Sequence, residues 1–166
     1  MVVTSALSYL SDIRGGRMNR ERGRVLAVDP GEKRIGLAIS DPTGTIANPL
    51  QVLKHVSRLI DAATIVQIAR EWEVVEIVIG QAIELDGTPG VMGRKAERLA
   101  EAIRSQTNIP VILWDESGST QTARNARKKM GVKRSQRRGH MDDLAAVVIL
   151  QSYLDDRDSV FTAGEE

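Results

Sequence analysis

Cysteine is absent from the 166-residue chain, and aromatic residues make up only 3% of it. Without cysteine the protein has no disulfide, no thiolate metal site and no cysteine nucleophile. The scarcity of aromatic side chains leaves few platforms on which single-stranded bases could stack. We therefore expect any bound nucleic acid to be held through its backbone and its shape.

Several common sequence signals are also missing. No apolar run approaches the roughly 18 residues of a membrane-spanning helix, and the first ten residues lack the basic flank of a secretory signal. The chain contains no glycine-rich phosphate loop, no paired-histidine zinc spacing and no nucleophile elbow. We predict a cytoplasmic protein, and with 42% hydrophobic residues the length suits one well-buried domain.

Three carboxylates stand at the ends of segments that resemble core elements. Asp29 closes the apolar run Val25–Val28, Glu116 follows the run Val111–Asp115, and Asp142 opens a helical stretch. Each has an ordinary explanation, because aspartate often starts turns and acidic residues favour the first turn of a helix. Those explanations do not account for the fact that a mixed sheet with this order of strands and helices would bring all three carboxylates together.

Converging carboxylates predict a metal site. They repel one another, and beside apolar strands they cost free energy unless they are hydrogen-bonded or bind a cation. Hard divalent ions relieve that repulsion, and an oxygen-only ligand set favours Mg²⁺, with Mn²⁺ as a substitute. Two metal ions about 3.5–4 Å apart can activate a water and stabilise the leaving oxygen of a phosphodiester. We therefore predict that Asp29, Glu116 and Asp142 are catalytic metal ligands of a hydrolase.

A basic segment indicates the substrate. Eight basic residues and no acidic one lie between positions 124 and 140, although the net charge of the whole chain is only +1. A charge run is usually a solvated face, but beside a carboxylate cluster it favours a polyanion held through its phosphates. The predicted nucleic-acid contacts are Lys33 and Arg34 in the first hairpin together with Arg124, Arg127, Lys128, Lys129, Lys133, Arg134, Arg137 and Arg138.

Hydrophobic periodicity predicts an α/β domain with a mixed five-stranded sheet flanked by helices. The predicted strands cover residues 25–28, 35–39, 49–53, 76–80 and 111–114. The predicted helices run from a cap at Ser57 to Trp72, from 92 to 103, from Ser117 or Ser119 to Gly131, and from 141 to 154. This gives a flexible extension over residues 1–23, the domain over 24–156 and a C-terminal tail over 157–166.

Three blocks of the sequence resemble a known family. Val28–Asp41 matches over more than ten consecutive positions, and Trp114–Glu116 with Ser119-Thr120 and Met141–Gln151 match as well. The sequence resembles the YqgF (RuvX) family, bacterial proteins described as pre-16S rRNA nucleases or Holliday junction resolvases. The resemblance covers about Arg24 to Asp155.

The resemblance implies an RNase H-like fold and a metal-dependent nuclease, most simply an endonuclease. The family's acidic triad maps onto Asp29, Glu116 and Asp142, and Asp143 stays open as the third ligand. Spacing to the following Ala-Ala pair favours Asp142. Ser117 and Gly118 stand where most members carry arginine and leucine, so a positive charge is missing there.

Several functions stay open from the sequence. The first is 5′-end processing of pre-16S rRNA in ribosome biogenesis, and its close variant is resolution of branched DNA. A non-catalytic RNA-binding assembly factor would keep the basic segment without needing three carboxylates. An ATP-using relative of the wider superfamily is disfavoured because such enzymes close a cleft between two lobes. We predict a monomer or a homodimer. We expect His55 and His140 to have surface or loop roles.

Overall fold

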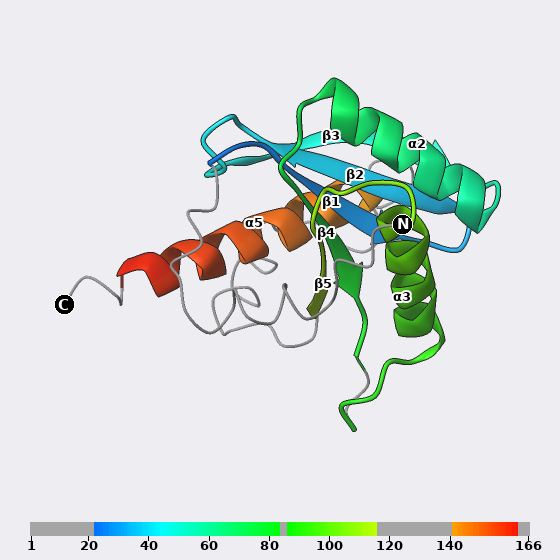
Figure 1. The fold of residues 1–166 in the computed structure, drawn as a ribbon. Coiled ribbons are helices and arrows are strands. Elements are labelled where there is room, and N and C mark those ends of the chain that lie inside the picture. The colour runs from blue at the N-terminus through cyan, green and yellow to red at the C-terminus, as the bar shows by residue number, and fades with distance from the viewer. Residues whose placement is uncertain (1–21, 84–85, 116–140, 163–166) are drawn as a thin grey trace, which may run out of the picture.

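A five-stranded mixed sheet with helices on both faces forms the protein, as predicted (Figure 1). The computed structural model describes residues 22–83, 86–115 and 141–162, with side chains in the last segment from 144 to 159. The elements are β1 (Val25–Pro30), β2 (Arg34–Ser40), β3 (Ala47–Lys54), α2 (Arg58–Glu71), β4 (Glu76–Gln81), α3 (Val91–Arg104), β5 (Val111–Asp115) and α5 (Met141–Thr162).

The strand order is β3-β2-β1-β4-β5. The first three strands form two antiparallel hairpins, whereas β4 pairs parallel to β1 and β5 pairs parallel to β4. Parallel neighbours need a crossover connection, and α2 and α3 supply the two crossovers. The carboxyl ends of β1, β4 and β5 consequently lie at one edge of the sheet.

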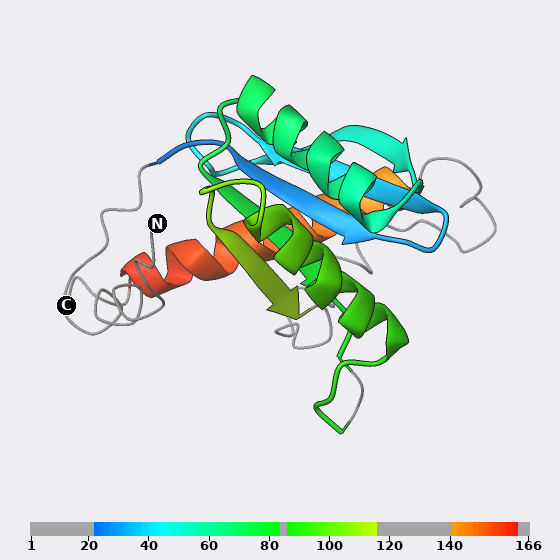
Figure 2. The same ribbon diagram turned by 45° about the vertical axis from the view of Figure 1, so that its right-hand side comes forward.

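Two apolar cores sandwich the sheet. Alternate residues of β1 face opposite sides, so Leu26 and Val28 pack with α2 and α3, while Val25 and Ala27 pack with α5. Figures 1 and 2 show α2 and α3 on one face and α5 crossing the other. Because both faces are covered, the central strands carry continuous apolar runs, Val25–Val28 in β1 and Ile77–Ile79 in β4, as expected for a parallel core.

Helix α2 begins where the sequence predicts. The Ser57 side chain accepts a hydrogen bond from the Ile60 N–H, and the helix ends at a cap on Trp72. Its core face is formed by Ala62, Ile65, Val66, Ile68 and Ala69. Leu59, which shares the periodic pattern, is nevertheless 65% exposed in the first turn of the helix.

The predicted end of the last helix is wrong. The apolar pattern stops at Leu154, but α5 continues to Thr162, so the predicted tail boundary at 157 falls inside the helix. Arg157 donates a hydrogen bond to the Gly44 carbonyl at 2.9 Å, a contact that holds the polar continuation against the β2–β3 hairpin. The helix predicted to end at Gly131 lies outside the described residues. None of the helices in the described segments is long and apolar enough to cross a membrane.

Polar contacts fix α5 along the sheet. The buried Tyr153 hydroxyl donates to the buried carboxylate of Glu76, at the start of β4. The Gln151 amide accepts from Ala47 N at 3.0 Å and donates to Thr45 O at 3.1 Å. These partners lie at the edge of the sheet where β1 and β4 begin, so the first turn of α5 is directed toward the opposite edge.

We predict that Tyr153→Phe lowers the free energy of unfolding by about 1–3 kcal/mol, because the buried Glu76 carboxylate loses a hydrogen-bond donor. Urea unfolding of the parent and variant measures the change. Gln67→Ala is the matched control, since Gln67 contacts Glu71 on an exposed face of α2. Equal effects of the two substitutions would contradict the assigned importance of the Tyr153 contact.

Candidate active site

Asp29 is placed by the end of the central strand. Val25 to Val28 are fully buried, and Asp29 is the first residue of β1 that is partly exposed. The chain then turns through Pro30 and Gly31 into β2. The aspartate therefore sits at the point where a rigid apolar strand reaches the surface.

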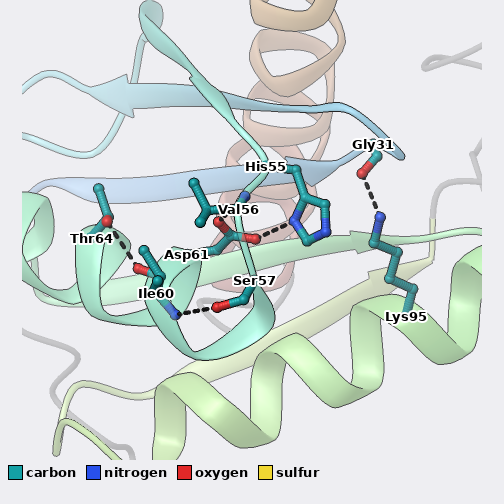
Figure 3. Close-up of polar contacts among 8 residues, drawn as sticks. All are labelled: Gly31, His55, Val56, Ser57, Ile60, Asp61, Thr64 and Lys95. Atoms are coloured by element: carbon teal, nitrogen blue, oxygen red, sulfur yellow. Dashed lines mark hydrogen bonds and ion pairs between the residues drawn. The ribbon is translucent and has the colours of Figure 1, made fainter.

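The turn that follows Asp29 is tightly closed. The Gly31 N–H donates to the Arg34 carbonyl at 2.9 Å, and a Cβ at position 31 would lie 2.4 Å from that oxygen. Glycine is required because any side chain would force the backbone apart. Lys95 of α3 donates from Nζ to the Gly31 carbonyl at 2.7 Å (Figure 3). The turn is thus tied to a helix far away in the sequence.

His55 holds the other side of this turn. Its backbone N–H donates to the Lys33 carbonyl at 2.9 Å, and its ring Nδ1 lies 2.5 Å from Asp61 Oδ2 (Figure 3). Asp61 is buried, and its other oxygen accepts from the Val56 N–H at 3.1 Å. His55 does lie in a loop, as predicted, but its ring anchors the end of β3 to α2. The sequence carries no signal for a pairing between a loop and a helix turn.

Alternation along the strands decides which carboxylates share a face. Asp29 continues the side of Val25 and Ala27, which is the face covered by α5. Asp115 pairs in register with Gln81, whose amide donates to Glu97 of α3 at 2.9 Å. Directly paired residues project to the same side. Asp115 therefore belongs to the α2–α3 face, opposite Asp29.

The first turn of α5 lies toward the edge that carries Asp29. Glu76, the partner of Tyr153, is in register with Val25 at the start of β1. From Tyr153 back to Asp142 the helix rises about 16 Å, and from Val25 to Asp29 the strand advances about 13 Å. Both ribbon views show the start of α5 at the end of the sheet where the β1 arrow terminates.

The remaining predicted site residues are placed only in part. Asp142 and Asp143 belong to the first turn of α5, while Glu116 and the basic residues from Arg124 to Arg138 lie outside the described residues. Lys33 and Arg34 are exposed at the β1–β2 turn, beside Asp29. Among the side chains that the structure describes, which do not include those of residues 116–143, no group of three metal-ligating residues is formed.

Comparison with known proteins assigns the family. A family model described as "Holliday junction resolvase" (RuvX) matches residues 23–156. The chain belongs to the RuvX family. This confirms the resemblance predicted from the sequence, and the matched range includes all five strands and the greater part of α5.

Relatives of the RuvX family cover most of the chain. Proteins from Syntrophus aciditrophicus and Thermoanaerobacter pseudethanolicus are each 42% identical to it, over 132 and 133 residues. These alignments span 80% of this chain and 88% and 96% of the respective relatives. Both relatives carry the name "Putative pre-16S rRNA nuclease".

Solved structures confirm the RNase H-like fold of this RuvX chain. Thermus thermophilus RuvC in complex with a Holliday junction substrate has a TM-score of 0.52 at 16% identity. The alignment covers 82% of this chain and 96% of the RuvC chain. Thermus thermophilus RuvC in a second structure gives a TM-score of 0.51.

We predict that Gly31→Ala opens the β1–β2 turn, because the new Cβ would collide with the Arg34 carbonyl. Amide hydrogen exchange of Gly31 and His55, whose N–H groups bond to this turn, should become faster. Gly87→Ala is the control: its positive φ of 83° makes alanine unfavourable there, yet a Cβ meets no atom within 4 Å. Unchanged exchange at both turn amides in Gly31→Ala would contradict the prediction.

Proposed function

We propose that the protein is a metal-dependent nuclease whose carboxylate site comprises Asp29, Glu116 and Asp142. One observation carries the proposal: Asp29 ends β1 on the face toward which α5 directs its first turn. That edge is also where β5 ends, immediately before Glu116. The ends of β1 and β5 and the start of α5, each next to an acidic residue in the sequence, thus lie toward one region of the sheet.

The alternation of β5 supports Glu116 over Asp115 as the second ligand. Ile112 and Trp114 pack with the core under α5, and Trp114 meets the Tyr153 ring edge-on at a centroid distance of 5.3 Å. A strand that continues this alternation past Asp115 directs the next side chain to the α5 face. Glu116 would then share the face of Asp29.

Oxygen donors alone make up this proposed ligand set, which suits a hard divalent cation such as Mg²⁺, with Mn²⁺ as a substitute. The half-buried position of Asp29, directly after four fully buried residues, favours a carboxylate that is compensated by a cation. Asp29, Glu116 and Asp142 would hold the metal, with Asp143 as the alternative third ligand. The bound metal would supply water activation and charge stabilisation at the leaving oxygen.

The chain's own residues position the substrate. The tight turn after Asp29 fixes the carboxylate, while the exposed Lys33 and Arg34 are suited to contact phosphates. The basic residues from Arg124 to Arg138 would add further phosphate contacts. Aromatic residues make up only 3% of the sequence, so recognition would rest on the backbone and shape of the nucleic acid.

We propose the 5′ end of pre-16S rRNA as the substrate, because two relatives at 42% identity carry that activity in their names. Branched DNA is the second candidate, since the matching family model is described as a Holliday junction resolvase. A purely RNA-binding assembly factor would not need the carboxylate ends of three elements at one edge. Cleavage of a precursor rRNA leader and of a four-way DNA junction, assayed side by side in Mg²⁺, tests these three possibilities.

We predict that Asp29→Asn, Glu116→Gln and Asp142→Asn each reduce cleavage by at least about 100-fold while the thermal unfolding midpoint stays near that of the parent. Loss of one ligand would misplace the attacking water at a metal site. Asp115→Asn is the matched control and should cut at the parent's rate, because Asp115 belongs to the opposite face. Asp143→Asn distinguishes the two candidates for the third ligand.

Parent-like cleavage by all three carboxylate variants would reject the proposed site. Binding of the rRNA leader without cleavage by the parent would favour the assembly-factor function.

We further predict that replacing Lys128, Lys129, Arg137 and Arg138 together by glutamine flattens the salt dependence of binding. Each phosphate contact contributes a log–log slope of roughly −0.7 to −0.9 through counterion release. Fluorescence anisotropy with the labelled rRNA leader at several salt concentrations measures the slope. An unchanged slope in the quadruple variant would place the nucleic acid elsewhere on the protein.

A further inference from the structure

We propose that Lys95 of α3 is a positioning residue for substrate binding, because it holds the β1–β2 turn through a backbone carbonyl. Lys33 of this turn is a phosphate contact of the proposed nuclease, so the inference rests on that function and deepens it. Lys95 would act through the turn, without touching the substrate.

The Lys95 side chain connects two elements that are far apart in the sequence. Its Nζ donates a hydrogen bond to the Gly31 carbonyl at 2.7 Å, across 64 positions of the chain. Figure 3 shows the side chain extending from α3 to the turn. The residue is half-buried, and a charged donor makes such a bond stronger than one between neutral groups. The contact therefore fixes the direction of the peptide that follows Gly31.

The part of α3 that carries Lys95 is itself fixed to the end of β4. A Cβ at Gly93 would lie 2.4 Å from the Ala82 carbonyl, so the helix backbone closely approaches the connection that follows β4. The Gln81 amide, buried at the end of β4, donates to the Gly93 carbonyl at 3.3 Å and to Glu97 Oε1 at 2.9 Å. Lys95 thus extends from a rigid base and ties the carboxyl end of β4 to that of β1.

Two backbone hydrogen bonds hold the rest of the turn. The Gly31 N–H donates to the Arg34 carbonyl, and the His55 N–H donates to the Lys33 carbonyl, both at 2.9 Å. Lys95 fixes the peptide that precedes Glu32, while His55 fixes the peptide that follows Lys33. The backbone of Glu32 and Lys33 is therefore constrained from both ends, and this backbone sets the direction of the exposed Lys33 side chain.

Lys95 reaches the turn from the face opposite the Asp29 side chain. Helix α3 packs with α2 on one face of the sheet, whereas Asp29 continues the side of Val25 and Ala27 under α5. Asp29 is in register with Gly36 of β2, so strand pairing holds its backbone independently of Lys95. Loss of the Lys95 contact should therefore affect substrate binding by the turn more than the reaction at Asp29.

A purely structural tie is the alternative explanation for this contact. Buried apolar residues of α3, such as Ala96, Leu99 and Ile103, already pack the helix against the sheet. The Lys95 bond lies apart from that core, at the end of the sheet where substrate binding is proposed. The two explanations differ in what depends on Lys95, which is stability alone in one case and affinity for nucleic acid in the other.

A double-mutant cycle in the full chain separates these explanations. Binding is measured in the Asp29→Asn background, which avoids cleavage, for the parent, Lys95→Met, Lys33→Gln and the combination. The probes are a fluorescein-labelled precursor rRNA leader and a labelled four-way DNA junction. Arg98→Met is the matched control, because Arg98 is an exposed cation about one turn farther along the same helix. Lys95→Arg is the conservative variant that keeps a donor.

We predict that Lys95→Met weakens binding by roughly three- to tenfold, the equivalent of one hydrogen bond. The same substitution should have little further effect when Lys33→Gln is present, because coupled residues are not additive. Lys95→Arg should retain most of the affinity. Arg98→Met should have equal effects with and without Lys33.

Cleavage by variants that keep Asp29 gives a second readout. Lys95→Met should raise KM and leave kcat near that of the parent, since strand pairing holds Asp29. Amide hydrogen exchange of Gly31 should become faster in Lys95→Met and stay unchanged in Arg98→Met.

The contrary results are distinct. Equal weakening by Lys95→Met with and without Lys33 would show that Lys95 acts independently of the turn and would overturn the positioning role. A lower thermal unfolding midpoint with unchanged affinity would assign the contact to stability alone and overturn it as well. In both cases the parent still cuts, so the proposed nuclease function stands. A parent that binds but cuts neither probe would reject the nuclease, while the binding cycle still decides the role of Lys95.

Discussion

The parallel pairing of β1, β4 and β5 is the constraint on which the site depends. It brings three carboxyl ends to one edge, and the register is fixed because both faces of these strands are buried. A slip of one residue would transfer every side chain to the other face. Asp29 would then face α2 and α3, and Val28 would leave its core. The strand register that packs the core therefore also sets the face of the sheet on which Asp29 lies.

The first turn of helix α5 is positioned by contacts near the other end of the helix. Its anchors, the Tyr153–Glu76 contact and the Gln151 and Arg157 hydrogen bonds, all lie at the edge opposite the proposed site. Because a helix is a stiff rod, fixing one end directs the other. Contacts at one edge of the sheet thus set the direction of the first turn of α5 at the other edge.

The hairpin beside Asp29 is anchored at its turn by side chains and backbone groups from other elements. Lys95 and His55 both bind the turn on the face of the sheet that α2 and α3 cover. Gly31 allows the backbone at position 31 to approach the Arg34 carbonyl closely. These contacts fix the position of the turn that follows Asp29.

The sequence by itself determined the fold class and most of the elements. Short apolar runs bounded by turn residues indicated the strands, and Ser57 indicated the start of α2, because these signals are local. It also indicated Asp29 through the Asp-Pro-Gly turn and the family resemblance. The end of α5 was missed because residues 155–159 are polar, and the contact of Arg157 with Gly44 that holds this stretch against the hairpin is a tertiary one.

Tertiary structure alone decided which side chains share a face. The opposition of Asp115 to Asp29, the pairing of Arg34 with Lys54 and the His55–Asp61 contact all depend on strand register or on the packing of a loop against a helix. Neighbouring residues of one strand, such as Trp114 and Asp115, point to opposite faces of the sheet. That direction is set by partners far along the chain, and composition and local periodicity contain no information about those partners.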